Sequence, residues 1–166
     1  SIATGDYIDV ESARASVRIS NCSVRNTRAR GFLLQSKDMV VENCSFSQLA
    51  LPGLLIAPDV ADWFEMGPSS RVIVRNCTFT KCCANSGSAA NTGALSVKVG
   101  HDSSGGGYAA GVHRDFAIYG NAFSNCSPRG LYLDSVNGAY VNNNTGADTK
   151  TVNCANVGTT FDKYVF

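Results

Sequence analysis

One stretch of this sequence returns after 22 residues, a period too long for a helical turn and too short for a domain. The run NCSVRNTRARGFLLQS at positions 21–36 reappears as NCSFSQLALPGLLIAP at 43–58. Later copies are more widely spaced but align on the apolar residue that follows each Asn/Cys element: Val24, Phe46, Phe79 and Phe123. Periods of 20–50 residues indicate a repeat architecture, in which no unit buries its apolar face without stacking on its neighbours.

Further positions recur around this anchor. Two residues before it stand Cys22, Cys44, Cys77 and Asn121, and a weaker fifth copy places Asn144 in the same column. Three residues earlier come Ile19, Val41, Val74 and Ile118, and a glycine follows each anchor at Gly31, Gly53, Gly93 or Gly130. Alternating segments such as VRI and VIV are typical of strands with one buried face, and no window keeps a helical apolar stripe.

One coil per repeat would place equivalent residues about 4.8 Å apart along a common axis. The sequence therefore predicts an all-β fold, a right-handed parallel β-helix (solenoid). We expect a single domain over residues 1–166 that is a piece of a longer solenoid.

The cysteines follow the same columns. Cys22, Cys44 and Cys77 are predicted to be stacked, reduced core thiols, because free cysteine packs as a small apolar residue. Cys82 and Cys126 share a second column, three residues past their anchors. Cys83 and Cys154 lie outside both columns and are the candidates for a disulfide.

The composition limits the classes of partner that we expect the chain to bind. The net charge is +1, only 16% of residues are charged, and no segment clusters Lys or Arg, so we expect no nucleic-acid partner. No apolar run is long enough to predict a membrane span, and no targeting signal follows Ser1. The chain has no CxxC pair and its two histidines lie far from most cysteines, so we expect no zinc site.

Extra residues interrupt the repeat near 57–70, 83–92 and 100–115. The first insertion places Asp59, Trp63 and Glu65 close together, with the only Trp of the chain. Carboxylates beside an indole ring suit sugar recognition, since the ring covers an apolar sugar face while acids bind hydroxyls or transfer protons. The alternative is that Trp63 covers the core edge and the acids are merely solvated. His113 and Arg114, in the last insertion, are expected to be surface structure.

At these residues the chain resembles the C-terminal half of the β-helix of glycoside hydrolase family 110, the exo-acting α-1,3-galactosidases. The specific elements are RARG at positions 28–31 and DVADWFEMG at 59–67. VIVRNCTFTKCC, FAIYGNAF and LYLDSVNGAYVNNNT are similar in order and spacing, so that the likeness covers most of residues 5–146.

The resemblance implies an inverting hydrolase of terminal α-linked galactose that needs neither metal nor organic cofactor. It assigns galactose binding to Asp59, Trp63 and Glu65. Arg28 and Arg30 would orient a carboxylate or sugar hydroxyl, with an inter-coil salt bridge as the alternative. The adjacent Asp-Asp pair of the family has no counterpart, because no two acidic residues are neighbours in this chain. The catalytic residues are therefore unassigned, and we expect the isolated chain to be inactive.

The implied partners are a galactose-terminated glycan and either the remaining coils of a longer parent chain or a self-associating partner. The resemblance also implies a secreted or cell-envelope location. Two other readings of the fold stay open. One is a polysaccharide lyase with Ca²⁺ on Asp59, Asp62 and Glu65, and the other is a non-catalytic glycan-binding β-helix.

Overall fold

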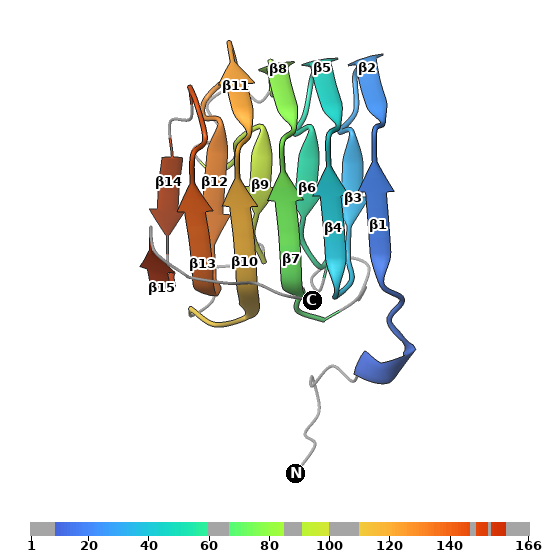
Figure 1. Cartoon of the computed structure of the whole chain (residues 1–166), viewed down its shortest axis with the longest axis vertical. Helices are drawn as coiled ribbons and strands as arrows, with labels where there is room; N and C mark the ends of the chain where they lie inside the picture. Colours follow the sequence, from blue (N-terminus) through green and yellow to red (C-terminus); the bar gives the residue numbers. More distant parts are fainter. Residues whose placement is uncertain are drawn as a thin grey trace.

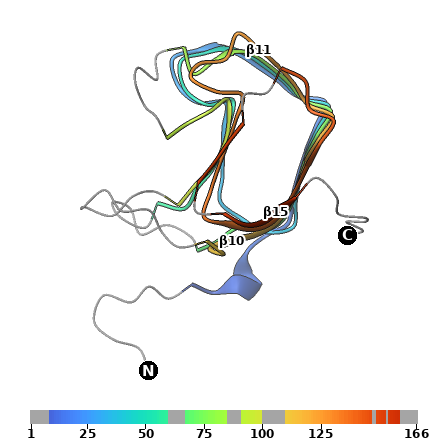
Figure 2. The same ribbon diagram turned by 90° about the vertical axis from the view of Figure 1, so that its left-hand side faces the viewer.

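Three parallel sheets form the walls of a stack of coils (Figures 1 and 2). The computed structural model describes residues 9–59, 67–84, 91–99, 110–146, 149–152 and 154–158. Sheet A contains β1 (Val17–Ser20), β4 (Met39–Glu42), β7 (Ser70–Arg75), β10 (His113–Tyr119), β13 (Val136–Asn142) and β15 (Ala155–Gly158). Sheet B contains β2 (Ser23–Thr27), β5 (Ser45–Leu49), β8 (Thr78–Cys82) and β11 (Ala122–Ser124). Sheet C contains β3 (Phe32–Leu34), β6 (Leu54–Ile56), β9 (Leu95–Val97), β12 (Leu131–Asp134) and β14 (Thr149–Val152).

The first four coils each take one strand from each sheet in the order A, B, C, and equivalent strands of successive coils pair in parallel. A 3₁₀ turn, η1 (Glu11–Ala13), precedes the first coil. The described residues contain no α-helix, and none of their helical segments has the length and apolar character needed to cross a bilayer. This arrangement confirms the predicted parallel β-helix.

The strand register reproduces the columns read from the sequence. Val24 pairs with Phe46, Phe46 with Phe79, and Phe79 with Phe123. The column three residues before the Cys/Asn positions is also confirmed, since Ile19, Val41, Val74 and Ile118 are successive partners in sheet A. The three phenylalanine rings stack 4.9 Å apart and nearly parallel in the core.

The glycine column is explained by these rings. A Cβ on Gly31 would lie 2.9 Å from a ring carbon of Phe46, and one on Gly53 would lie 2.8 Å from a ring carbon of Phe79. The alignment of Gly93 with this column is wrong by one residue. Leu95 pairs with Leu54, so that Ala94 takes the glycine position and buries its methyl group in the core.

The Asn/Cys corner combines two local requirements. The residue before each Cys or Asn of the column has a positive φ of 50–66°, at Asn21, Asn43, Asn76, Gly120 and Asn143. Asn and Gly tolerate this left-handed conformation better than other residues, which explains the recurring Asn-Cys pair. The next residue then turns its side chain toward the coil before it.

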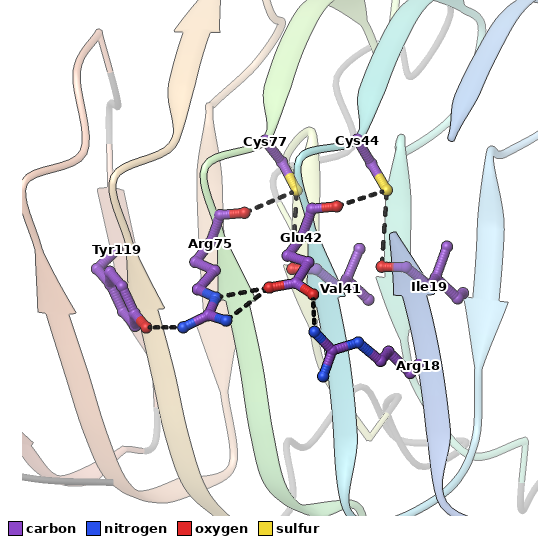
Figure 3. Close-up of polar contacts among 8 residues, drawn as sticks. All are labelled: Arg18, Ile19, Val41, Glu42, Cys44, Arg75, Cys77 and Tyr119. Atoms are coloured by element: carbon purple, nitrogen blue, oxygen red, sulfur yellow. Dashed lines mark hydrogen bonds and ion pairs between the residues drawn. The ribbon is translucent and has the colours of Figure 1, made fainter. Parts of the chain in front are cut away.

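Cysteine and asparagine make equivalent hydrogen bonds at that corner. Each side chain donates to the carbonyl three positions before its counterpart in the preceding coil: Cys44 to Ile19, Cys77 to Val41, Asn121 to Val74 and Asn144 to Ile118. The two thiol contacts are visible in Figure 3. Cys44 and Cys77 are thus confirmed as stacked core thiols, and the pairing of Ser23 with Ser45 places Cys22 in the same column.

One cysteine departs from the prediction, and the two disulfide candidates do not form a disulfide. Cys44 and Cys77 are buried, but Cys22 is exposed because it belongs to the first coil and no described coil lies beyond it. All seven cysteines carry reduced thiols. Cys83 donates to the Gly93 carbonyl and Cys154 to that of Leu133, so neither of these two forms a disulfide.

Candidate functional site

All three insertions leave the coils at the edges of sheet C. Residues 57–70 and 100–115 connect sheet C strands (β6, β9) to sheet A strands (β7, β10), and 83–92 connect β8 of sheet B to β9. Figure 2, which looks along the stack, shows the coils superposed at these corners. Loops carried by a rigid scaffold are where binding groups usually lie, so the outer face of sheet C is a candidate binding surface.

Two buried polar side chains point to this outer face from β12. Side chains alternate along a strand, and because Leu131 and Leu133 lie in the core, Tyr132 and Asp134 face outward. Both are nevertheless fully buried, with 0% of their surface exposed. Asp134 Oδ1 accepts from Ser135 Oγ at 3.2 Å, whereas Asp134 Oδ2 and the Tyr132 hydroxyl have no hydrogen-bond partner in the described part of the chain.

An unpaired buried polar atom costs roughly 1–3 kcal/mol, so two of them side by side require an explanation. A ligand that offers hydroxyl groups would satisfy both. Burial also raises the pKa of Tyr132, and the nearby Asp134 adds to the effect, so the phenol stays protonated and able to donate.

Two cations share this face. Lys98 directly follows β9, and because Val97 pairs with Leu133, Lys98 lies beside Asp134 on the neighbouring strand. Burial lowers the pKa of the half-buried Lys98, and the charge of Arg30 lowers it further, while Asp134 opposes both. Arg30 is therefore near enough to Lys98 to act on it electrostatically.

The structure does not bring together Arg28, Arg30 and Asp59, which the sequence assigned to the same sugar. Arg28 and Arg30 are exposed and precede β3, whereas the half-buried Asp59 follows β6, the strand beside β3. Asp59 and the two arginines thus lie at opposite ends of the sheet C strands. Asp59 comes two residues after Ala57, which is the neighbour of Lys98 in register. Trp63 and Glu65 lie outside the described residues, so their assignment stays a prediction.

His113 is not a surface residue, as the sequence had suggested, but is fully buried at the first position of β10. Its Nδ1 accepts from the Ser69 backbone N–H at 3.1 Å, so the neutral ring carries its proton on Nε2 and donates to the Lys98 carbonyl, also at 3.1 Å. Burial lowers the pKa of His113 to about 4. This neutral imidazole fixes the start of β7 against Lys98. Arg114, by contrast, is exposed as expected.

Sequence reasoning missed Lys98, Tyr132 and Asp134 as functional residues. The signal available was the alternation in LYLD, which puts Tyr132 and Asp134 opposite the core leucines. Nothing in the linear sequence places Lys98 next to them, because 35 residues separate Lys98 from Leu133 and only the register of β9 with β12 brings them together.

The described residues contain no group of three or more His, Cys, Asp or Glu side chains that could hold a metal ion. Asp62 and Glu65, which the lyase reading requires, lie outside the described ranges. The expected absence of a metal and the Ca²⁺ alternative both stay predictions.

The fold is a parallel β-helix. The outer face of its sheet C carries buried polar side chains between the loop insertions. The chain is 27% identical over 147 residues to alpha-1,3-galactosidase A of Bacteroides fragilis, an alignment covering 88% of this chain and 24% of the relative. It is 33% identical over 82 residues to alpha-1,3-galactosidase A of Akkermansia muciniphila, covering 49% of this chain and 14% of the relative.

A third relative, alpha-1,3-galactosidase B of the same organism, is 35% identical over 80 residues, covering 48% of this chain and 10% of the relative. No model of a known protein family matches. These relatives confirm the predicted resemblance to α-1,3-galactosidases, and the chain spans about a quarter of their length or less.

Proposed function

We propose that this chain is part of the β-helix of a glycoside hydrolase that removes terminal α-linked galactose, and that the outer face of sheet C binds the galactose. The names of the relatives support the reaction class. The observation that carries the location is the pair of buried, unpartnered polar atoms, Tyr132 Oη and Asp134 Oδ2.

The chemistry of the face suits a sugar. A hydroxyl group both donates and accepts, so it can donate to the Asp134 carboxylate while accepting from the Lys98 ammonium. Asp59, Trp63 and Glu65 would close the pocket from the first insertion, as the resemblance implies. In a largely covered site, a small number of polar groups at fixed positions orients the ligand.

The reaction itself needs groups beyond this chain. Inversion requires an acid and a base carboxyl roughly 6.5–9.5 Å apart with a water between them. The chain has no adjacent acidic pair, so we propose that the catalytic pair belongs to other coils of a longer parent chain. The mechanism would be metal-free, the glycan would be galactose-terminated, and the location would be secreted or in the cell envelope.

Calorimetric titration of the chain with galactose tests the binding site. Wild type is expected to bind galactose in preference to its 4-epimer glucose, and Asp134→Asn and Tyr132→Phe should each weaken binding about tenfold or more. Tyr119→Phe, which removes a hydroxyl from sheet A, is the matched control and should bind as wild type does. Absence of galactose binding by folded wild type, or equal affinity in all variants, would refute the proposal. An assay with an aryl α-galactoside should show negligible turnover.

A further inference from the structure

A polar cavity lies at the corner between sheets C and A. This corner cleft has a volume of about 600 Å³ and is bounded by η1 with its flanking residues, by residues 68–71 at the start of β7, and by residues 111–115 at the start of β10. The buried His113 separates it from the sheet C face, because the ring bonds Ser69 on the cleft side and Lys98 on the other. The corner cleft is therefore distinct from the galactose site proposed above.

The charges of the described residues that line the corner cleft balance. Three arginines (Arg14, Arg71, Arg114) face three acids (Asp9, Glu11, Asp115). Arg14 forms an ion pair with Asp9. Arg71 forms a bidentate ion pair with Asp38, with N–O distances of 2.5 and 2.9 Å. A lining without net charge favours a neutral ligand over a phosphate or an acidic polysaccharide.

Several donors in the corner cleft have no partner among the described residues. Ser69 is 1% exposed, and its hydroxyl is unpaired. Arg14 has a side chain 5% exposed, and its Nε is unpaired. Arg114 is exposed, and its Nε donates to the Gly111 carbonyl at 3.3 Å, while its two terminal nitrogens make no hydrogen bond within the described residues. Buried polar groups such as the Ser69 hydroxyl and Arg14 Nε normally have partners, so their place in the wall of one cavity points to a ligand.

We propose that the corner cleft is a second carbohydrate-binding site that holds one neutral sugar unit through its hydroxyl groups. The choice of a sugar rests on the proposed function, whereas the neutral, hydroxyl-rich character of the ligand follows from the lining. The planar fork of Arg114 presents paired donors to adjacent hydroxyls, and Asp115 and Glu11 accept from them. The described residues that line the corner cleft include no aromatic side chain, so their part in recognition is hydrogen bonding and not ring stacking.

Backbone amide NMR of the full chain distinguishes the two sites. On titration with galactose, glucose or N-acetylglucosamine, we expect the signals of Gly111 and Val112 to shift with at least one sugar. Arg114→Met and Ser69→Ala should each weaken that response tenfold or more and leave the galactose-dependent shifts of Tyr132 and Asp134 unchanged. Asp134→Asn should do the reverse. Arg25→Met, which removes an exposed arginine from β2 in sheet B, is the control and should change neither.

The outcomes separate the two proposals. If Gly111 and Val112 respond to no sugar, or respond equally in Arg114→Met and Ser69→Ala, the inference is overturned while the sheet C proposal stands on its own signals. A response to inorganic phosphate but not to sugars overturns it as well. If only the corner cleft responds, the second site is supported and the sheet C site is refuted.

Discussion

Asn121 and Asn144 stand one above the other in successive coils, and Nδ2 of Asn121 donates to Oδ1 of Asn144 at 2.9 Å. Oδ1 of Asn121 in turn accepts from the backbone N–H of Cys77, one coil earlier, at 2.9 Å. The amide therefore links three coils through one buried side chain. Where Cys occupies the same column, its thiol lies 3.8 Å from the equivalent carbonyl of the preceding coil and closer, at 3.2–3.3 Å, to the carbonyl two residues before it.

Replacing Asn121 with alanine should destabilise the fold more than replacing it with cysteine. The alanine variant leaves the Cys77 N–H and the Val74 carbonyl without their side-chain partner, and unpaired buried groups cost about 1–3 kcal/mol each, so we expect a loss of about 2–4 kcal/mol. Asn121→Cys restores a donor to the Val74 carbonyl and should lose roughly half as much. Urea unfolding measures both. Equal losses would show that the amide bonds contribute little.

Glu42 is predicted to stabilise sheet A in a pH-dependent way. It is nearly buried and accepts from Arg75 through Oε2 at 2.6 and 2.9 Å and from Arg18 through Oε1 (Figure 3). The hydrogen bonds from Arg75, aided by the charge of Arg18, hold the Glu42 pKa below its usual range. This stabilisation is present above the ordinary glutamate pKa and is lost as pH falls through the lowered folded value.

Thermal unfolding of Glu42→Gln should therefore show a lower Tm than wild type at pH 7 and a smaller fall in Tm on acidification. Arg75→Met should lower the Tm more than Arg18→Met, because Arg75 makes two bonds to Glu42 and a third to the Tyr119 hydroxyl at 3.1 Å. The Arg18 side chain is 67% exposed, so its charge is screened by solvent. The reverse order of the two arginine variants would contradict this account.

His113 should make the fold sensitive to mild acid. Its folded pKa of about 4 lies below the ordinary value of 6.5, so the unfolded chain binds more protons between these pH values. The contribution is complete above pH 6.5 and is lost as pH falls to about 4, an interval worth about 3 kcal/mol. The stability difference between wild type and His113→Gln, followed by urea unfolding from pH 7.5 to 4, should shrink by about that amount. A difference that stays constant with pH would rule out titration of His113.

Cys126 is predicted to be the thiol that reacts at the lowest pH. The neighbouring Cys82 thiol holds the pKa of the half-buried Cys126 below its usual range. Burial raises the pKa of Cys77 to about 12, so that thiol should stay unreactive in the folded protein. Mass-spectrometric mapping of iodoacetamide labelling should show that the Cys126 rate reaches its midpoint at a lower pH than the rate of an ordinary thiol. Cys82→Ala should move that midpoint upward, and an unchanged midpoint would show that Cys82 has no such effect.

The repeat period alone determined which residues stack. Val24, Phe46, Phe79 and Phe123 align correctly because each coil must return one strand to the same wall, and an inserted loop changes the spacing without changing the column. The Asn-Cys corners were readable for the same reason, since the left-handed turn selects Asn or Gly in every coil. The glycine column shifted by one at Ala94, where an insertion precedes it and sequence offers no second anchor.

Tertiary structure decided which polar groups are buried and which come together. His113 is in the core corner because β10 begins inside the last insertion, a boundary that local sequence does not mark. Lys98 meets Asp134 only through the pairing of β9 with β12, and Arg30 is separated from Asp59 by the length of sheet C. A repeat determines which residues are neighbours along the stack. Which side chains are buried on the outer faces depends on how the non-repeating segments fold back over them. A periodic sequence pattern contains no information about those segments.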